Sequence, residues 1–401
     1  MTISWRAHRV RVVCFLLCGG LSFSQATGAT GDSFSFVVLA DPHVYGDLRS
    51  PSSQRLQQCV EWVNRNRQAY GIELTFVVGD IGFGGNGAHV QTAKTILDGL
   101  TVPYAPIIGD NDILTPEDEV HFANTFEPVY QSLAANPQFS NWSRGPVRVW
   151  DPDVGVYDYL QNFAFEYRGV HFVCPDWCDR ETITWPGHDP IRREDAELHD
   201  FPGGTWPWFT DYITHCSKTK FENIVMLAHH PMHTYKGALA PLASYGAFAL
   251  AEFVQIRSFL NDPNHDYRPY VALAYAGHYH SDVYFPADMD PNRITINGEP
   301  FDPNVIDPNC LVRLPGYDLY ITDAVWDDEV RLYLVQVTEQ ADGFSYVSTS
   351  LLVPEPAVAW FLLFGEAVRR AVRRAPRVGR SVVHPPAKIA TRASTVNETP
   401  R

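Results

Sequence analysis

Short apolar runs of strand length alternate along the chain with segments whose apolar residues recur at a helical period. Apolar runs of this length, bounded by turn residues, are typical of buried strands. In five places Asp, His or Asn follows such a run within one or two residues. The five runs are FSFVVLA (34–40), LTFVV (74–78), YAPII (104–108), NIVMLA (223–228) and VALAYA (271–276).

Helices are expected between the first strands. One face of the first helix would carry apolar side chains from each turn, and a second helix would do the same. A third helix is predicted to begin at Thr115-Pro116-Glu117-Asp118, which has an N-cap, a first-turn proline and acidic first-turn residues. Strands alternating with helices predict a layered α/β fold. The apolar faces are Leu56, Cys59, Val60 and Val63 in the first helix, and Ala93, Ile96, Leu97 and Leu100 in the second.

The later part of the chain is less regular. We expect FAFEY (163–167) and VHFVC (170–174) to form a hairpin, and residues 317–325 and 330–337 to form a closing hairpin. Residues 249–260 predict a helix, and residues 285–316, rich in Pro, Asn and Asp, a long loop. The Asp-rich pieces at 151–158 and 287–307 lack the spacing of a calcium loop and are interpreted as solvated turns.

The polar groups that follow the five strands share one chemistry. Strand carboxyl ends are where ligands bind in open α/β sheets, so these groups predict a common site. Carboxylate, imidazole and carboxamide ligands without thiolate suit Mn, Fe, Zn or Mg ions. The groups are Asp41-Pro42-His43, Gly79-Asp80, Gly109-Asp110-Asn111-Asp112, His229-His230-Pro231 and Gly277-His278-Tyr279-His280.

Composition and charge limit the classes of molecule that the protein can bind. The 401 residues are 45% hydrophobic and suffice for one large domain or two. The net charge is −15, and many basic residues lie before Asp32 or after Pro354, so the body between them is strongly acidic. An acidic body repels polyanions, which argues against duplex nucleic acid as a partner. A small phosphorylated substrate stays compatible, because a metal site supplies local positive charge.

The N-terminus has the three parts of a secretory signal. Basic residues up to Arg11 precede an apolar stretch (12–23), and small residues at 26–29 offer a cleavage zone. We therefore expect residues 1–29 to be a signal peptide and the protein to be exported to the periplasm, the cell surface or the medium. A short membrane anchor is the alternative.

The number of cysteines does not determine which of them form disulfides. Beyond the predicted signal the cysteines number five, which is odd, so at most two disulfides form and one thiol is left over. Cys174 and Cys178 are candidates to pair with each other or with Cys216, and the connectivity does not follow from the sequence. The five are Cys59, Cys174, Cys178, Cys216 and Cys310.

The C-terminal segment 353–401 differs from the body at 30–352. Val353-Pro354-Glu355-Pro356 is followed by a short apolar stretch and paired arginines, which resembles the Pro-Glu-Pro C-terminal sorting signal of exported bacterial proteins. Glu366 interrupts the apolar stretch, and that stretch falls short of the ~20 residues of a spanning helix. A basic amphipathic helix with a disordered tail is the alternative. Transient or C-terminal membrane association is left open.

The five polar groups, in their order, resemble the motifs of the calcineurin-like metallophosphoesterases: Asp-x-His, Gly-Asp, Gly-Asn-His-Asp/Glu, His-x-Pro and Gly-His-x-His. The resemblance covers about residues 33–340. It implies a four-layer α/β/β/α sandwich of two mixed sheets with a dinuclear metal centre. It also implies hydrolysis of a phosphomonoester or phosphodiester by attack of a hydroxide bound at the dinuclear metal centre.

Carried over residue by residue, the resemblance assigns the ligands of both ions. The two histidines of His278-Tyr279-His280 suit this role, because residues two apart in an extended segment point the same way. The first ion would be held by Asp41, His43, Asp80 and His280, and the second by Asp80, Asp110, His229 and His278, with Asp80 bridging.

The third group departs from the family pattern. Asp110-Asn111 stands where the family has Asn-His, and a carboxamide gives up no proton near pH 7. Asp110, Asn111 and His230 are the candidate catalytic residues, with His89 and His233 as further candidate proton donors. Either another residue supplies the proton, or the leaving group is good, or the enzyme is slow.

Two other functions compete with this interpretation. A non-catalytic relative would keep the scaffold and bind a ligand through the aromatic-rich region between about 120 and 215. Residues 82–87 match G-x-G-x-x-G, which would indicate a dinucleotide-binding oxidoreductase. That reading gives the Asp and His groups no role, so we expect these glycines instead to let a loop pass close to the metals.

Overall fold

The computed structural model describes residues 32–184, 189–232, 247–262, 264, 267, 269–288, 290–300, 317–327 and 329–354. The predicted signal peptide, the sorting-signal-like stretch from residue 355 onward, His233 and Cys310 lie outside these residues. The chain divides into a unit from Met1 to Val353 and a second unit from Pro354 to Arg401. The fold described below belongs to the first unit.

The first sheet has five strands in the order β18-β17-β1-β2-β3. Strands β1, β2 and β3 are parallel, whereas β17 runs antiparallel to both β1 and β18. Its strands are β1 (Ser33–Ala40), β2 (Ile72–Val78), β3 (Tyr104–Ile107), β17 (Arg331–Glu339) and β18 (Phe344–Leu352).

The second sheet has nine strands among the described residues, in the order β15-β14-β13-β16-β12-β11-β8-β7-β4. Strands β8, β11, β12 and β16 are parallel and form its centre, and antiparallel pairs complete both sides. Its strands are β4 (Phe139–Arg144), β7 (Phe163–Tyr167), β8 (Val170–Cys174), β11 (Ile224–Leu227), β12 (Val271–Ala276), β13 (Val283–Phe285), β14 (Thr295–Ile296), β15 (Glu299–Pro300) and β16 (Asp318–Ile321).

Helices and two small hairpins make up the rest of the secondary structure in the described part of the unit. The hairpins are β5 (Arg148–Asp151) with β6 (Val156–Tyr159), and β9 (Thr182–Ile183) with β10 (Ile191–Arg192). Thr115 and Asp118 form the capping box at the start of the third helix, as the sequence predicts. The helices are α1 (Pro51–Tyr70), α2 (Gly87–Leu97), α3 (Pro116–Ala135), α4 (Thr205–His215) and α5 (Leu250–Leu260), with the 3-10 turns η1 (Phe83–Gly85), η2 (Asp110–Asp112) and η3 (Pro291–Arg293).

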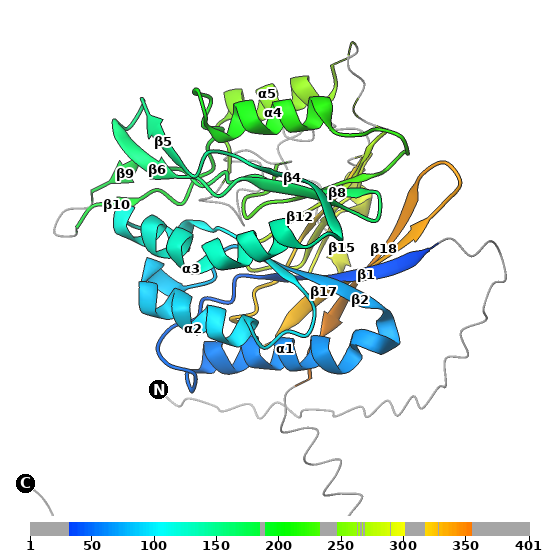
Figure 1. Ribbon diagram of the computed structural model, residues 1–401, viewed down its shortest axis with the longest axis horizontal. Coiled ribbons are helices and arrows are strands. Elements are labelled where there is room, and N and C mark those ends of the chain that lie inside the picture. Colours follow the sequence, from blue (N-terminus) through cyan, green and yellow to red (C-terminus); the bar gives the residue numbers. More distant parts are fainter. Residues whose placement is uncertain are drawn as a thin grey trace, which may run out of the picture. The chain divides into compact units, whose positions relative to one another are not determined.

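Two apolar cores hold four layers together. Rings of the two sheets meet in the inner core, where Phe36 of β1 lies 5.3 Å from Phe172 of β8 between ring centroids. The next residue of β8, Val173, packs in the outer core together with Phe209 of α4 and Ile256 of α5. Alternate residues of one strand thus face two cores. Helices α1 to α3 lie on the side opposite α4 and α5 (Figure 1), which gives the predicted four-layer α/β/β/α sandwich.

The predicted closing hairpin is wrong. Strand β16 lies between β13 and β12 in the second sheet, whereas β17 pairs with β1 and β18 in the first sheet. The turn around Trp326 therefore carries the chain from one sheet to the other. The true hairpin partner of β17 is β18, which the sequence analysis overlooks. The loop predicted at 285–316 contains η3, β14 and β15 within its described part.

Two further expectations need correction, one on burial and one on disulfides. The Asp-rich piece at 151–158 does form an exposed turn around Asp153, but Asp151 and Asp158 at its two ends are fully buried. The cysteines Cys59, Cys174, Cys178 and Cys216 are free thiols, so the pairings considered for Cys174 are not formed. Among the described helices, none combines the length and the apolar character that crossing a membrane requires.

Candidate metal centre

The predicted ligands gather where the carboxyl ends of both sheets meet. Asp41 and His43 follow β1, Asp80 follows β2, and Asp110 follows β3 of the first sheet. The imidazoles come from the second sheet: His229 follows β11, while His278 and His280 follow β12. All seven converge, so the site is built between the two sheets rather than along the edge of one.

One group consists of Asp41, His43, Asp80 and His280. Each offers one ligand atom, and the four atoms lie within 4.8 Å of one another. The Nε2 atoms of His43 and His280 are 2.9 Å apart, and Nε2 of His43 is 3.3 Å from Oδ2 of Asp80. These are the residues that the sequence analysis assigns to the first ion.

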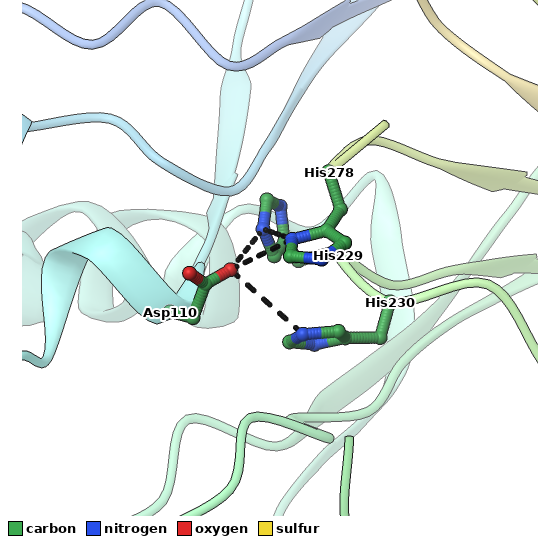
Figure 2. A group of neighbouring side chains, drawn as sticks. All are labelled: Asp110, His229, His230 and His278. Carbon is green, nitrogen blue, oxygen red and sulfur yellow. Dashed lines mark hydrogen bonds and ion pairs between the residues drawn. The ribbon is translucent and has the colours of Figure 1, made fainter. Parts of the chain in front are cut away.

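A second group consists of Asp110, His229, His230 and His278 (Figure 2). Oδ1 of Asp110 is its centre, 2.7 Å from Nε2 of His229 and 2.9 Å from Nδ1 of His278. Nε2 of His230 lies farther from the same oxygen, at 3.8 Å. The ligand set predicted from the sequence has Asp80 here rather than His230, so His230 is an additional candidate ligand.

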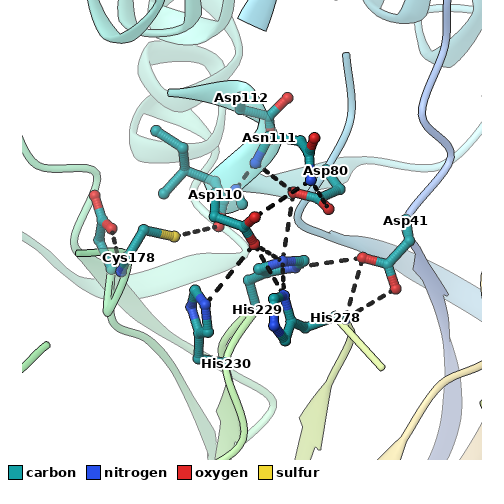
Figure 3. Close-up of polar contacts among 12 residues, drawn as sticks. Asp41, Asp80, Asp110, Asn111, Asp112, Cys178, His229, His230 and His278 are labelled. Atoms are coloured by element: carbon teal, nitrogen blue, oxygen red, sulfur yellow. Dashed lines mark hydrogen bonds and ion pairs between the residues drawn. The ribbon is translucent and has the colours of Figure 1, made fainter. Parts of the chain in front are cut away.

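Asp80 faces both groups. Its Oδ2 is the atom near His43, and its Oδ1 is 3.4 Å from Nε2 of His229 (Figure 3). The backbone N–H and the side-chain amide of Asn111 donate to Oδ1 and Oδ2 of Asp80, each at 2.9 Å. Asp80 is 1% exposed, so its carboxylate is fixed between the groups, as a bridging ligand would be.

The backbone at the ligands is in an uncommon conformation. Ten described residues other than glycine have positive φ, and five of them are predicted ligands. A left-handed residue with a Cβ is held only where its surroundings fix it, and such residues cluster at functional sites. The five are Asp41 (φ 49°), His43 (φ 40°), Asp80 (φ 48°), His278 (φ 74°) and His280 (φ 47°).

The glycines that accompany the ligands are needed for close approach. A Cβ on Gly79 would overlap the imidazole of His229, and a Cβ on Gly109 would overlap the backbone nitrogen of Asp80. A Cβ on Gly277 would lie 2.8 Å from Oδ2 of Asp41. These glycines therefore let the ends of the two sheets come together.

Protonation states fit metal ligation at some of the predicted ligands and not at others. Burial raises the pKa of Asp41 well above its usual value, and although burial alone lowers the pKa of His229, the surrounding carboxylates raise it. Burial lowers the pKa of His43 and lowers that of His280 to about 4, so both imidazoles are neutral at pH 7. Although burial alone favours the acid, the imidazoles of His278 and His229 hold the pKa of Asp110 well below its usual value. Neutral imidazoles and ionised carboxylates are the forms that bind divalent ions.

His230 bears most directly on the fit to a metal. Its side chain is fully buried, and neither ring nitrogen has a hydrogen-bond partner among the described residues. The main chain of Glu194 is near without completing a hydrogen bond. Burial, helped by the imidazoles of His278 and His229, lowers the pKa of His230 well below its usual value. A neutral, unpartnered imidazole facing Asp110 is suited to hold an ion and poorly suited to donate a proton.

Asp112 has a supporting role. Its Oδ1 accepts the N–H of Gly82 at 2.7 Å, and its Oδ2 accepts those of Ile81 and Gly109, both at 3.0 Å. Asp112 thus ties the loop after β2 to the loop after β3, which keeps Asp80 and Asp110 together.

An aromatic cluster that is not predicted from the sequence lies beside His43 and is formed by Tyr45, Phe83 and Trp326. The ring of His43 lies 5.6 Å from Trp326 and 6.0 Å from Phe83, and Phe83 and Trp326 are stacked at 5.8 Å. Tyr45 is 38% and Phe83 45% exposed.

The glycines around Phe83 do not bring the loop close to the metal ligands, although the sequence predicts that they would. Gly82 approaches Val90 of α2, and Gly85 approaches Asp118 of α3.

No model of a protein family matches the sequence, and no curated protein matches it either. Solved structures resemble it at low identity. A purple acid phosphatase from yellow lupin (Lupinus luteus) seeds has a TM-score of 0.45 and 10% identity over 80% of this chain and 52% of that one. This chain thus spans about half the length of the lupin protein.

Two other solved structures are similar to the chain. A phosphopantetheinyl hydrolase from Mycobacterium tuberculosis has a TM-score of 0.39 and 9% identity over 81% of this chain and 98% of that one. GAP50, described as the anchor in the inner membrane complex of Plasmodium, has a TM-score of 0.40 and 11% identity over 80% and 85%. At such values these likenesses say nothing of the activity of this chain.

Proposed function

We propose that the protein is an exported, divalent-metal-dependent phosphoesterase. The observation that carries the proposal is the pair of Asp/His groups with Asp80 between them, one carboxylate oxygen directed to each group. Asp41, His43, Asp80 and His280 would hold one ion. Asp80, Asp110, His229 and His278 would hold the other, with His230 as a further ligand. Export rests on the signal-like residues 1–29.

The protein groups have distinct tasks in the proposed reaction. A pair of divalent ions, when bound, lowers the pKa of water and neutralises charge on phosphoryl oxygens. Asp80 holds the two halves of the centre in register, and Asn111 orients Asp80 through two hydrogen bonds. The Asn111 amide also donates to Oδ2 of Asp110 at 3.2 Å, so it serves positioning rather than proton transfer.

Hydrolysis assays test the proposed function directly. The full chain, freed of metal and reloaded with Mn²⁺ or Zn²⁺, should hydrolyse p-nitrophenyl phosphate or bis-p-nitrophenyl phosphate, and the preferred ester separates monoesterase from diesterase. The chelated protein is the control and should be inactive until metal is restored. Absence of hydrolysis in a protein that holds two ions would overturn the proposal.

A non-catalytic binding protein is the second candidate, favoured by the lack of a proton donor at Asn111. It would need an exposed aromatic surface in the region of about 120 to 215. Trp177 is 1% and Trp206 8% exposed, and both pack in the outer core against α4. These two tryptophans stabilise the fold, whereas Trp150 and Tyr157 of the β5–β6 hairpin are 52% and 47% exposed with ring centroids 5.2 Å apart, so a surface for a partner would lie on that hairpin.

Selectivity for good leaving groups follows from Asn111. We expect kcat/KM for p-nitrophenyl phosphate to exceed that for phenyl phosphate by roughly 100-fold or more, because general acid catalysis contributes about 100- to 10,000-fold where it is present. An Asn111→His variant should narrow the gap. Similar rates for both esters in the wild type would mean that another residue donates the proton.

Binding of an aryl group is expected to depend on the aromatic cluster. Replacing Phe83 by leucine should raise KM for p-nitrophenyl phosphate about 3- to 10-fold, since an aromatic pair contributes about 0.5–1.5 kcal/mol beyond its buried area. KM for a short alkyl phosphate should not change. Phe221→Leu is the matched control, because Phe221 is similarly exposed, at 49%, and lies outside the cluster. An equal effect of both substitutions would remove the cluster from substrate binding.

A further inference from the structure

A second buried cluster of possible metal ligands lies outside the candidate centre. It consists of Asp151 at the end of β5, Glu197 and His199, whose ligand atoms all lie within 4.8 Å of one another. Asp151 and His199 are fully buried, and Glu197 is partly buried. None of the three is predicted from the sequence to be a metal ligand.

The unsatisfied atoms of this cluster face one another. Oδ2 of Asp151, Oε2 of Glu197 and Nδ1 of His199 are buried and have no hydrogen-bond partner among the described residues. Nδ1 of His199 is 3.6 Å from Oε2 of Glu197. Buried polar atoms are nearly always paired, so three unpaired atoms in one place require an explanation.

The tautomer of His199 follows from its other nitrogen. Nε2 lies 2.9 Å from the carbonyl oxygen of Cys178. A carbonyl can only accept, so Nε2 carries the hydrogen and donates it. In the neutral imidazole Nδ1 is then left with its lone pair, directed toward the carboxyl group of Glu197. With both carboxyl groups ionised, the cluster presents three electron-pair donors and no hydrogen. In the absence of an ion, burial and the neighbouring Asp179 carboxylate raise the pKa of Glu197 to about 9, so that group keeps its proton at pH 7.

Within the described part of the chain, the nearest partners that side chains outside the cluster offer to its two carboxyl groups are themselves carboxyl groups. Asp179 interacts with Glu197, and Asp158 with Asp151, so they add negative charge rather than compensate it. Oδ1 of Asp151 already accepts the N–H groups of Asp153 and Val154, at 2.7 and 3.1 Å, which leaves Oδ2 free. The nearby arginines form their ion pairs with other carboxylates: Arg180 with Glu119 and Asp176, Arg192 with Glu119 and Asp158, and Arg193 with Asp179, Glu181 and Asp195.

A single water cannot satisfy the cluster either, because it donates two hydrogens to three acceptors. A divalent cation satisfies all three at once, and the two carboxylates neutralise its charge. Metal–ligand distances of about 2.0–2.2 Å bring two ligand atoms to at most roughly 4.4 Å, so inward shifts of a few tenths of an ångström close the site. One imidazole with two carboxylates suits Zn²⁺ or Mn²⁺ better than Ca²⁺ or Mg²⁺.

We propose that Asp151, Glu197 and His199 bind a third divalent ion, Zn²⁺ or Mn²⁺, with a structural role. The ion would join the β5–β6 hairpin to the segment at 195–199. That segment is already fixed by backbone hydrogen bonds, from Asp179 to Asp195 and from Glu197 to Trp177. The ion would thus anchor a part of the chain inserted between α3 and α4.

Metal content of the full chain tests this site. The metal-free protein is reloaded with Zn²⁺ or Mn²⁺ alone, excess ion is removed, and the ions per chain are counted by mass spectrometry. Glu197→Gln and His199→Asn should each hold about one ion fewer than the wild type. Glutamine keeps the shape of Glu197, and asparagine tolerates the positive φ of His199 (50°). The readout is a difference of one ion, so it does not depend on whether the other centre is filled.

Glu181→Gln is the matched control, since Glu181 is an exposed carboxylate in an ion pair with Arg193. It should keep every ion. Thermal unfolding supplies the second measurement: added Zn²⁺ should raise the Tm of the metal-free wild type more than that of Glu197→Gln. Equal metal content in the wild type and both cluster variants would overturn the site and mean that protons satisfy the carboxylates. An equal loss in Glu181→Gln would overturn it as well.

Discussion

Replacement of Asp80 by asparagine should abolish hydrolysis and release metal from both groups. We expect kcat to fall by at least ~1000-fold, the upper range for loss of one electrostatic contact in an active site. Asp80 is the residue whose two oxygens face His43 and His229. Asparagine keeps the size of the side chain and tolerates the positive φ of 48°, so the effect should come from lost charge and not from misfolding.

The measurements for Asp80→Asn are the ions bound per chain and the rate on p-nitrophenyl phosphate, with circular dichroism to establish the fold. Asp98→Asn is the control, because Asp98 caps α2 and pairs with Lys94 at 2.7 Å, away from the centre. A folded Asp80→Asn protein that hydrolyses as fast as the wild type would show that Asp80 does not bridge two ions.

Replacement of Gly79 by alanine should have the next largest effect. The added Cβ would overlap the imidazole of His229, which must then move. A misplacement of about 1 Å in a catalytic constellation costs roughly 100-fold in rate, so activity should fall by at least that factor. Stability should also fall, because a left-handed residue with a Cβ costs about 1–2 kcal/mol and forced packing costs about 1–3 kcal/mol more.

The chain contains a matched control for this substitution. Gly84 has a φ of 66°, close to the 73° of Gly79, and a Cβ there would meet no atom within 4 Å. Gly84→Ala should therefore show only the backbone cost, with metal content unchanged. Urea unfolding and metal content of the two variants separate backbone strain from the clash with His229. Equal behaviour of both variants would remove Gly79 from the construction of the site.

The candidate centre was accessible from sequence because each ligand directly follows a buried strand. An apolar run fixes where a strand ends, and a short motif such as Gly277-His278-Tyr279-His280 then fixes which side chains leave that end. The sequence alone could not show that Asp80 belongs between two sheets, or that His230 is buried beside Asp110. Those facts depend on how the sheets pack. The role of these residues as metal ligands stays a prediction.

The fold was predicted wrongly where one local sequence pattern is compatible with two structural arrangements. The strands around Trp326 look like a hairpin because both are apolar and the turn between them is polar and short. No local signal tells that β16 belongs to one sheet and β17 to the other. Similarly, Asp151 and Asp158 resemble residues of a solvated turn, and only packing against 195–199 and the arginines makes them buried.

Because each Asp/His group draws residues from both sheets, ions can bind only after both sheets have folded. The carboxylates Asp41, Asp80 and Asp110 lie within the first 112 residues, whereas His229, His278 and His280 come more than 100 positions later. A nascent chain therefore cannot assemble either group until its second half has been made and has paired with the first. Once bound, the ions would hold the two sheets together, and the protein without ions would be the form most susceptible to proteolysis.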